Sequence, residues 1–402
     1  MDMEDPKERL TKRVSTAELE RRWKLVREIM EERKIDYLVM QNSEAFLGGA
    51  VRWFTDFSVR YQFPMTVIFP VDDEMTTVSN GGDPPAEQSP PPWAARGIKN
   101  RLGAVYFPTA PYTNTREAEL AVGILKEKKK PTIGLVERAF IPITFFEYLM
   151  KHLPEAQFVD ATEWVDEIKV IKSPEEIELI QGTAALQDQA IEHLKKTIQP
   201  GLRDFEVAAE AQYSFLRNGS ERQLIQVGSG PAGTAVHFQP PHFQNRVIRE
   251  GDQITVLMET NGPGGYYTEI MRCFMVGRKP SQELQDAHGI AVETQTMNVN
   301  RLKPGVDPKD LWDMTNEFLK KNGYLPNLRL YAHGQGLSLV ERPFLWYKET
   351  WKLKAGMNIT VHPYARAASQ GVSACICDNW IIGKDGPGPC LHKTPKEVIV
   401  IE

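Results

Sequence analysis

The first third of the chain alternates short apolar runs with helical patterns. Residues 15–34 predict an amphipathic helix, because apolar side chains return every three or four positions and a serine opens the segment three residues before a glutamate, as in a capping box. Short runs rich in β-branched and apolar residues follow at 37–40, 65–69 and 133–136, with helical stretches between them. This alternation predicts an α/β domain.

A second domain is predicted to begin near residues 165–172. Directly after this segment, Ser173 and Pro174 followed by two glutamates are typical of the start of a long helix, since serine caps the first turn and proline fits the first helical position. Helices are expected over about 174–198, 204–218, 282–301 and 308–322. The strands between and after them predict an α+β domain with an antiparallel sheet. We therefore place the two domains at 1–168 and 169–402.

Composition and charge describe a soluble globular protein. The chain has 402 residues, of which 41% are hydrophobic and 25% charged, and its formal net charge is −5. This length suits two domains. Basic and acidic residues alternate along the chain, so no basic surface for nucleic-acid binding is expected. No apolar run approaches about eighteen residues and the N-terminus is charged, so we expect no membrane span, no signal peptide and a cytoplasmic location. Its four cysteines are too few for a disulfide framework.

Five blocks in the second half resemble those of the creatinase/prolidase/aminopeptidase P superfamily. They lie at 168–177, at Gly251-Asp252 with the strand that follows, and at 265–274, 333–337 and 354–363. The resemblance implies the pita-bread fold, in which a smaller α/β domain precedes a C-terminal α+β domain with a curved antiparallel sheet. It also implies a homodimer whose active site lies in the concave face of the C-terminal domain.

Peptidase members of this superfamily hold two adjacent divalent metals with two aspartates, one histidine and two glutamates. The resemblance places these five positions on Met258, Glu269, His333, His362 and Cys377. Methionine cannot replace a carboxylate. Glu259 could do so only if the turn 262–265 shifts the strand register by one residue, because neighbouring strand residues point to opposite faces. A dinuclear centre of the usual composition is therefore not expected.

Three interpretations of this altered site remain open. In the first, which is favoured, the site has lost its metal as in creatinase, its residues bind substrate and move protons, and no cofactor is needed. In the second, Glu269, His333, His362 and Cys377 hold one Zn or Fe ion per chain, because carboxylate, imidazole and thiolate are all competent ligands. In the third, the site is inactive and its side chains only fill space or bind a ligand.

Two residues outside the ligand positions resemble functional residues of creatinase. His237 stands eight residues after Ser229, where creatinase has its proton-transferring histidine, and histidine can take up and release a proton near neutral pH. Arg60 resembles the arginine that grips the substrate carboxylate. Met271 stands where creatinase has a carboxylate, which argues against creatine itself as the substrate.

These observations predict a hydrolase of a C–N bond in a small polar substrate, namely an amidine, urea-like, cyclic amidine or amide compound. The expected catalytic residues are His237, Glu269 and His333, and the expected substrate contacts are Arg60, His362, Cys377 and Glu259. The alternatives are a metal-dependent Xaa-Pro-type peptidase, a lyase acting on a small zwitterion, and a non-catalytic binding protein. The expected partners are a small-molecule substrate and a second copy of the chain, without nucleic acid or membrane.

Overall fold

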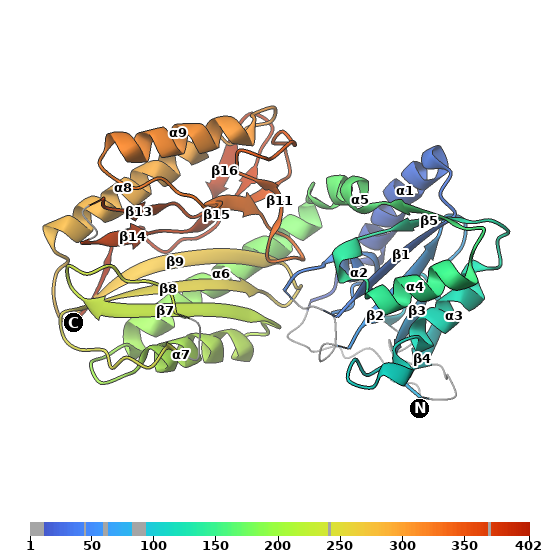
Figure 1. The fold of residues 1–402 in the computed structure, drawn as a ribbon. Helices are drawn as coiled ribbons and strands as arrows, with labels where there is room; N and C mark the ends of the chain where they lie inside the picture. The colour runs from blue at the N-terminus through green and yellow to red at the C-terminus, as the bar shows by residue number, and fades with distance from the viewer. Residues whose placement is uncertain (1–11, 44–45, 59–62, 83–93, 240–242, 369–370) are drawn as a thin grey trace. The chain divides into compact units, whose positions relative to one another are not determined.

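The computed structural model describes residues 12–43, 46–58, 63–82, 94–239, 243–368 and 371–402. The chain divides into two compact units, Arg13–Lys169 and Val170–Glu402 (Figure 1). The first is an α/β unit and the second an α+β unit, as the sequence predicts. None of the helices in the described ranges is long and apolar enough to cross a membrane.

The N-terminal unit carries a six-stranded mixed sheet in the order β4-β3-β2-β1-β5-β6. Its strands are β1 (Tyr37–Asn42), β2 (Met65–Pro70), β3 (Met75–Asn80), β4 (Ile98–Ala104), β5 (Thr132–Leu135) and β6 (Gln157–Asp160). The α-helices described in this unit are α1 (Thr16–Arg33), α2 (Ala50–Thr55), α3 (Arg116–Leu125), α4 (Ile143–His152) and α5 (Thr162–Lys169). Because β1 pairs with β2 on one side and with β5 on the other, the three predicted strand runs are neighbours in this sheet.

Helix α1 starts as its sequence predicts. The side chain of Ser15 accepts a hydrogen bond from the backbone N–H of Glu18 at 3.1 Å, which satisfies one of the free donors of the first turn. Leu19, Val26 and Met30 then recur on one face of the helix and are fully buried. The spacing of apolar residues in the sequence therefore predicts both the helix and the face of the helix that is buried.

The C-terminal unit begins with the predicted long helix. Ser173 and Glu176 form a reciprocal capping box, in which Ser173 Oγ accepts from Glu176 N at 3.2 Å and Glu176 Oε2 accepts from Ser173 N at 2.7 Å. The helices of this unit in the described ranges are α6 (Pro174–Thr197), α7 (Asp204–Arg217), α8 (Gln282–Val299) and α9 (Pro308–Lys321).

Three groups of strands form the sheets of this unit. The first sheet has the order β17-β9-β8-β7, from β7 (Gln223–Pro231), β8 (Asp252–Asn261), β9 (Tyr267–Val276) and β17 (Ile399–Ile401). The second has the order β11-β10-β12-β15-β16, from β10 (Ala332–Gly334), β11 (Glu341–Phe344), β12 (Asn358–Val361), β15 (Asp378–Ile382) and β16 (Pro387–Cys390). A two-stranded ribbon joins β13 (Tyr364–Arg366) to β14 (Ser373–Cys375). Apart from the parallel pair β17 and β9, the pairs in the two sheets are antiparallel.

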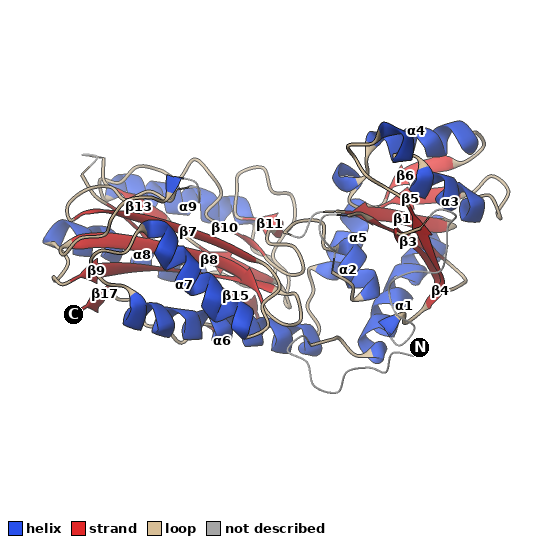
Figure 2. Cartoon of the chain, turned by 90° about the horizontal axis from the view of Figure 1, so that it is seen from below, coloured by secondary structure: helices blue, strands red, loops and turns tan. Residues whose placement is uncertain are grey.

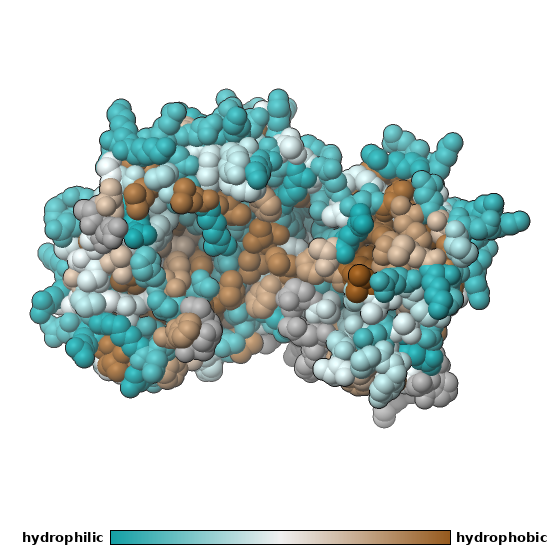
Figure 3. All heavy atoms as spheres, viewed as in Figure 1, coloured by the Kyte–Doolittle hydropathy of each residue, from teal (hydrophilic) through white to brown (hydrophobic). Residues whose placement is uncertain are grey.

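Helices cover both sides of these sheets. Helices α6 and α7 lie against the β7–β9 sheet, and α8 and α9 lie over the second sheet on the opposite side (Figures 1 and 2). The surface over α9 is hydrophilic (Figure 3), as expected of a helix that turns its apolar face to the sheet. The two sheets join where Met271 and Cys377 form an antiparallel bridge. Strands from both sheets therefore meet along one line, and the polar side chains of the site lie there.

Candidate metal centre

Two carboxylates face each other across strands β8 and β9. The strands pair without interruption from Gln253 with Met275 to Asn261 with Tyr267, and this register sets Glu259 directly opposite Glu269. Residues directly opposite each other project from the same face of a sheet, so both carboxylates lie on the site side. Sequence spacing suggested Met258 for the first of these positions, but the structure puts Glu259 there.

The turn between the strands explains this difference. Gly262 N donates to Tyr266 O at 3.2 Å and Gly265 N donates to Gly262 O at 2.9 Å, which closes a tight connection. The two carboxylates are therefore ten residues apart in the sequence, not eleven. Met258 points to the other face and is fully buried in the apolar core beneath α6 and α7.

Two histidines complete the centre from the second sheet. His333 lies on β10, and its Nδ1–H donates to Gly334 O at 2.9 Å, which leaves Nε2 with a free lone pair. That Nε2 atom is 3.8 Å from Glu269 Oε2 and 4.0 Å from Glu259 Oε1. His362 follows β12, and its Nε2 is buried and has no hydrogen-bond partner among the described residues.

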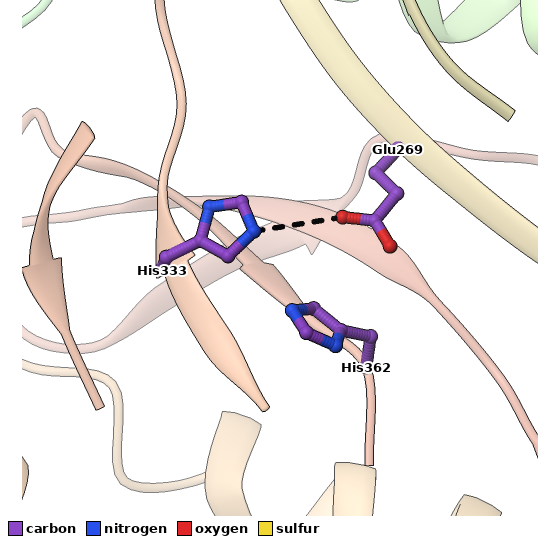
Figure 4. Close-up of side chains that lie close together, drawn as sticks. All are labelled: Glu269, His333 and His362. Atoms are coloured by element: carbon purple, nitrogen blue, oxygen red, sulfur yellow. Dashed lines mark ion pairs between the residues drawn. The ribbon is translucent and has the colours of Figure 1, made fainter. Parts of the chain in front are cut away.

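Glu269, His333 and His362 converge on one point (Figure 4). One ligand atom from each of these residues lies within 4.8 Å of the other two. Ligands placed about 2.0–2.2 Å from a single ion would be separated by about 3–4.4 Å, so a small inward movement would bring all three atoms onto one cation. The unpartnered Nε2 of His362 is the kind of buried polar atom that such an ion would satisfy.

Cys377 lies beside this cluster. Its Sγ is 2.9 Å from Thr360 Oγ1 and 3.5 Å from the backbone oxygen of Glu269. Thr360 Oγ1 in turn lies 3.4 Å from Glu269 Oε2. The sequence did not point to Thr360, although its position two residues before His362, on the same face of an extended segment, could have done so.

Burial controls the charges of the centre. It raises the pKa of Glu269 to about 7 and raises the pKa of Glu259 well above its usual value, with the neighbouring Glu269 carboxylate as the second cause for Glu259. Burial also lowers the pKa of His333 to about 4 and that of His362 well below its usual value. Both imidazoles are therefore neutral at pH 7, which is the form that binds metal. Two buried carboxyl groups beside two neutral imidazoles fit a divalent cation of the zinc or iron type.

A network of buried amides holds Glu269 in place. The backbone N–H of Glu269 donates to Asn379 Oδ1 at 2.8 Å. Asn379 Nδ2 donates to Gln335 Oε1 at 2.8 Å and to Asn358 Oδ1 at 3.1 Å. These three amides are almost completely buried and come from β12, β15 and the segment after β10. No motif in the sequence pointed to them.

A second group of candidate ligands, Asp378, Cys390 and His392, lies outside this centre. Asp378 already forms a fully buried ion pair with Arg272, whose Nη2 donates to Asp378 Oδ1 at 2.7 Å. Arg272 also donates to the backbone oxygen of Cys377 at 2.9 Å. The ion pair between Arg272 and Asp378 therefore holds β9 against β15, and the guanidinium supplies the positive charge that a metal ion would otherwise bring to this group.

The other predicted functional residues lie away from the cluster or outside the described ranges. His237 is exposed in the segment after β7, and its Nδ1 accepts a hydrogen bond from Tyr364 OH at 3.3 Å. Tyr364 packs against the apolar cluster that contains Met271 and Cys377, so one side chain connects His237 to the residues beside the centre. Arg60 lies outside the described residues.

Comparison with known proteins now gives the family. Residues 178–384 match the description "Metallopeptidase family M24", and residues 22–171 match the "Creatinase/Prolidase N-terminal domain". The chain belongs to metallopeptidase family M24. This confirms the resemblance to the creatinase/prolidase/aminopeptidase P superfamily and its pita-bread fold.

Relatives of this M24 chain carry peptidase names. A Xaa-Pro dipeptidase from Pyrococcus furiosus is 26% identical over 306 residues, which cover 73% of this chain and 86% of the relative. An uncharacterized peptidase from Bacillus subtilis, YqhT, is 27% identical over 252 residues, covering 62% of this chain and 69% of the relative. Among solved structures, the prolidase from Pyrococcus horikoshii OT3 superposes with a TM-score of 0.75 at 21% identity, covering 94% of this chain and 100% of that one. At that identity the likeness concerns the fold.

These findings correct two predictions. The favoured creatinase-like, non-peptidase activity is wrong, because the family is one of metallopeptidases and several relatives are named Xaa-Pro dipeptidases. The preference for a site without metal is wrong for the same reason. Both errors came from favouring the interpretation in which the changed ligand positions had lost the metal over the one in which they hold a single ion. Glu259 restores a carboxylate beside Glu269, and His362 brings a nitrogen where a glutamate was expected. The broader prediction of a C–N hydrolase agrees with the family, since a peptide bond is a C–N bond.

Proposed function

We propose that this chain is a metal-dependent peptidase that hydrolyses Xaa-Pro-type dipeptides and uses one metal ion per chain. The observation that supports this most directly is the convergence of Glu269, His333 and His362, together with the unpartnered Nε2 of His362. The names of the relatives supply the substrate class. Assembly as a homodimer remains a further proposal from the family resemblance, and a cytoplasmic location remains one from the sequence.

The ligand set suits Zn or Fe. One carboxylate and two imidazoles form a three-residue set that leaves a coordination position open for substrate or water. Such an ion, when bound, supplies Lewis acidity that polarises the scissile carbonyl and acidifies water. His333 is oriented to bind the metal, because the hydrogen bond from its Nδ1 to Gly334 O fixes the tautomer and points Nε2 toward the centre.

Glu259 is the group placed to move protons. Its Oε1 lies 4.0 Å from His333 Nε2, yet it stands outside the three-residue cluster. The charge of a bound cation would favour the ionised form of Glu259, whose carboxylate could then take a proton from water at Oε1 and return it to the leaving nitrogen of the peptide. His237 is proposed as a second proton carrier, which would reach the centre through Tyr364. Cys377 would line the centre beside Thr360.

Metal analysis combined with peptide hydrolysis tests this proposal. Purified protein should contain close to one Zn or Fe per chain, chelation should abolish hydrolysis of a dipeptide such as Ala-Pro, and metal should restore it. His362→Ala should weaken metal binding by at least about 100-fold, because a ligand matters more than the outer groups whose loss costs about 10- to 100-fold. His193→Ala is the matched control, since this histidine pairs with Glu210 on the surface. Metal-restored protein that cleaves no Xaa-Pro dipeptide would contradict the proposed activity.

A further inference from the structure

Lys172 and Glu341 form a buried ion pair in the C-terminal unit. Lys172 Nζ lies 2.7 Å from Glu341 Oε2, and the two side chains are only 3% and 7% exposed. The other oxygen of this carboxylate, Oε1, accepts a hydrogen bond from the backbone N–H of Ser338 at 3.2 Å. Removing one partner of a buried pair leaves the other charge without compensation, so the pair constrains the segments that carry it.

The pair packs directly against the loop that follows β10, the strand of His333. Glu341 is the first residue of β11 and is paired with Gly334 on β10. At Gly336, an added Cβ atom would lie 2.5 Å from Glu341 Oε1 and 2.5 Å from Lys172 Nζ, so only glycine fits against the pair. The backbone just after His333 is therefore held against the ion pair.

Backbone hydrogen bonds extend these contacts to the other strands of the centre. Gly336 O accepts from Tyr267 N at 2.7 Å, and Tyr267 is the first residue of β9, two residues before Glu269. Lys172 N donates to Gly356 O at 3.0 Å, in the turn that leads into β12 and from there to the second histidine of the centre. One ion pair is therefore connected to β9, β10 and β12, the strands on or beside which the three proposed ligands stand.

We propose that Lys172 is a positioning residue of the metal centre, which keeps the three ligand atoms at the spacing that one ion needs. Lys172 acts through Glu341 and the backbone around Gly336, and not on the substrate. This inference rests on the proposed function, which makes Glu269, His333 and His362 the ligands. Their ligand atoms lie within 4.8 Å of one another, so small shifts between the strands would change the distances to the ion. Loss of a group that orients ligands costs about 10- to 100-fold in metal affinity.

Lys172→Met tests this role with two measurements. The Glu341 carboxylate then stays buried without its counter-charge, so the contact between Gly336 and Tyr267 should open more often. Hydrogen–deuterium exchange at Tyr267 N–H should become at least about tenfold faster. The Kd for Zn²⁺, measured by calorimetry on chelator-treated protein, should rise about 10- to 100-fold.

Lys169→Met is the matched control. Lys169 Nζ lies 2.8 Å from Glu137 Oε1 and its side chain is also 3% exposed, but Lys169 belongs to the N-terminal unit. The substitution should lower the free energy of unfolding, as Lys172→Met does, because it too leaves a buried carboxylate without its lysine. Exchange at Tyr267 N–H and the Kd for Zn²⁺ should stay unchanged. If both variants weaken Zn²⁺ binding equally, or if neither does, Lys172 has no positioning role.

A double variant separates positioning from stability, and it also serves if Lys172→Met fails to fold. Lys172→Met with Glu341→Gln removes both charges and keeps an acceptor for Ser338 N, so the free energy of unfolding should return close to the wild-type value. Its Kd for Zn²⁺ should remain at least about tenfold above that of the wild type, because the ionic link to the loop is missing. Recovery of both quantities would show that the pair serves only stability. Wild-type protein that binds no metal would contradict the proposed function, whereas exchange at Tyr267 N–H would still decide whether Lys172 holds the loop to β9.

Discussion

At the scale of single residues, the centre combines one carboxylate ligand and two imidazole ligands with a second carboxylate beside them. Glu259 stands one position after the methionine that sequence spacing selects, and it faces Glu269 because the strands pair in that register. His362 offers a nitrogen where a glutamate was expected, and neutral imidazole is as good a ligand for zinc as carboxylate is. The donor set has therefore moved from oxygen toward nitrogen, which favours Zn or Fe over harder cations such as Mg.

Replacing Glu259 by glutamine separates proton transfer from metal binding. Glu259→Gln keeps the size of the side chain and removes its ability to accept a proton, so kcat for Ala-Pro should fall by about two to four orders of magnitude. Metal content, measured by elemental analysis, should stay close to that of the wild type, because Glu259 stands outside the three-residue cluster. Glu259→Asp should retain part of the activity. Loss of metal in parallel with activity would instead make Glu259 a ligand and contradict the assignment.

At the scale of elements, the centre depends on how two sheets are joined. Glu269 belongs to β9 in the first sheet, while His333 belongs to β10 in the second. Three contacts fix β9 against β15 and the residue before it, namely the bridge of Met271 with Cys377, the ion pair of Arg272 with Asp378, and the bond from Glu269 N to Asn379. Because ligands come from both sheets, anything that loosens this junction should spread the ligand atoms apart.

Asn379 provides the test of this junction. Asn379→Ala removes the acceptor for Glu269 N and leaves that buried N–H unsatisfied, at a cost of about 1–3 kcal/mol in the free energy of unfolding. It should also weaken metal binding about 10- to 100-fold, as measured by calorimetry. Asn298→Ala is the matched control, since this asparagine is fully buried on α8 and bonds to Thr315. It should lower stability to a similar extent and leave the metal affinity unchanged, and equal losses in both variants would disprove a positioning role for Asn379.

At the scale of the whole molecule, local signals in the sequence predicted the architecture and pointed to Glu269, His333 and His362, but they did not place the first carboxylate or the amides around Glu269. Helix α6 could be located because Ser173, Pro174 and Glu176 satisfy its first turn within a few residues. The first carboxylate could not be placed, because its position depends on the length of one glycine-rich turn, and a one-residue change moves a side chain to the opposite face. The amides around Glu269 come from segments distant in sequence, so only the folded chain brings them together.

The separation of the chain into two units predicts that stability can be changed without touching the catalytic centre. Glu117, on α3 of the N-terminal unit, is completely buried and accepts hydrogen bonds from Gln41 and Thr66. Burial raises its pKa to about 8. The folded state therefore holds the proton more tightly than the unfolded state, whose carboxyl has a pKa of about 4.3. The resulting stability is complete below about pH 4 and is lost as the pH rises to about 8.

Glu117→Gln should remove this pH dependence. Glutamine keeps an acceptor for Gln41 and Thr66 and carries no charge, so the variant should unfold at higher denaturant concentration than the wild type at pH 8 and above. Its advantage should shrink steadily toward pH 5 and reach a few kcal/mol at most at high pH, where the wild type must bury a carboxylate. Glu119→Gln is the matched control, because this residue lies on the same helix and pairs with Arg116 near the surface. The three proposed ligands of the metal centre lie in the C-terminal unit, so kcat for Ala-Pro should be the same in both variants. If the unfolding of Glu117→Gln keeps the pH dependence of the wild type, Glu117 is already ionised in the folded protein.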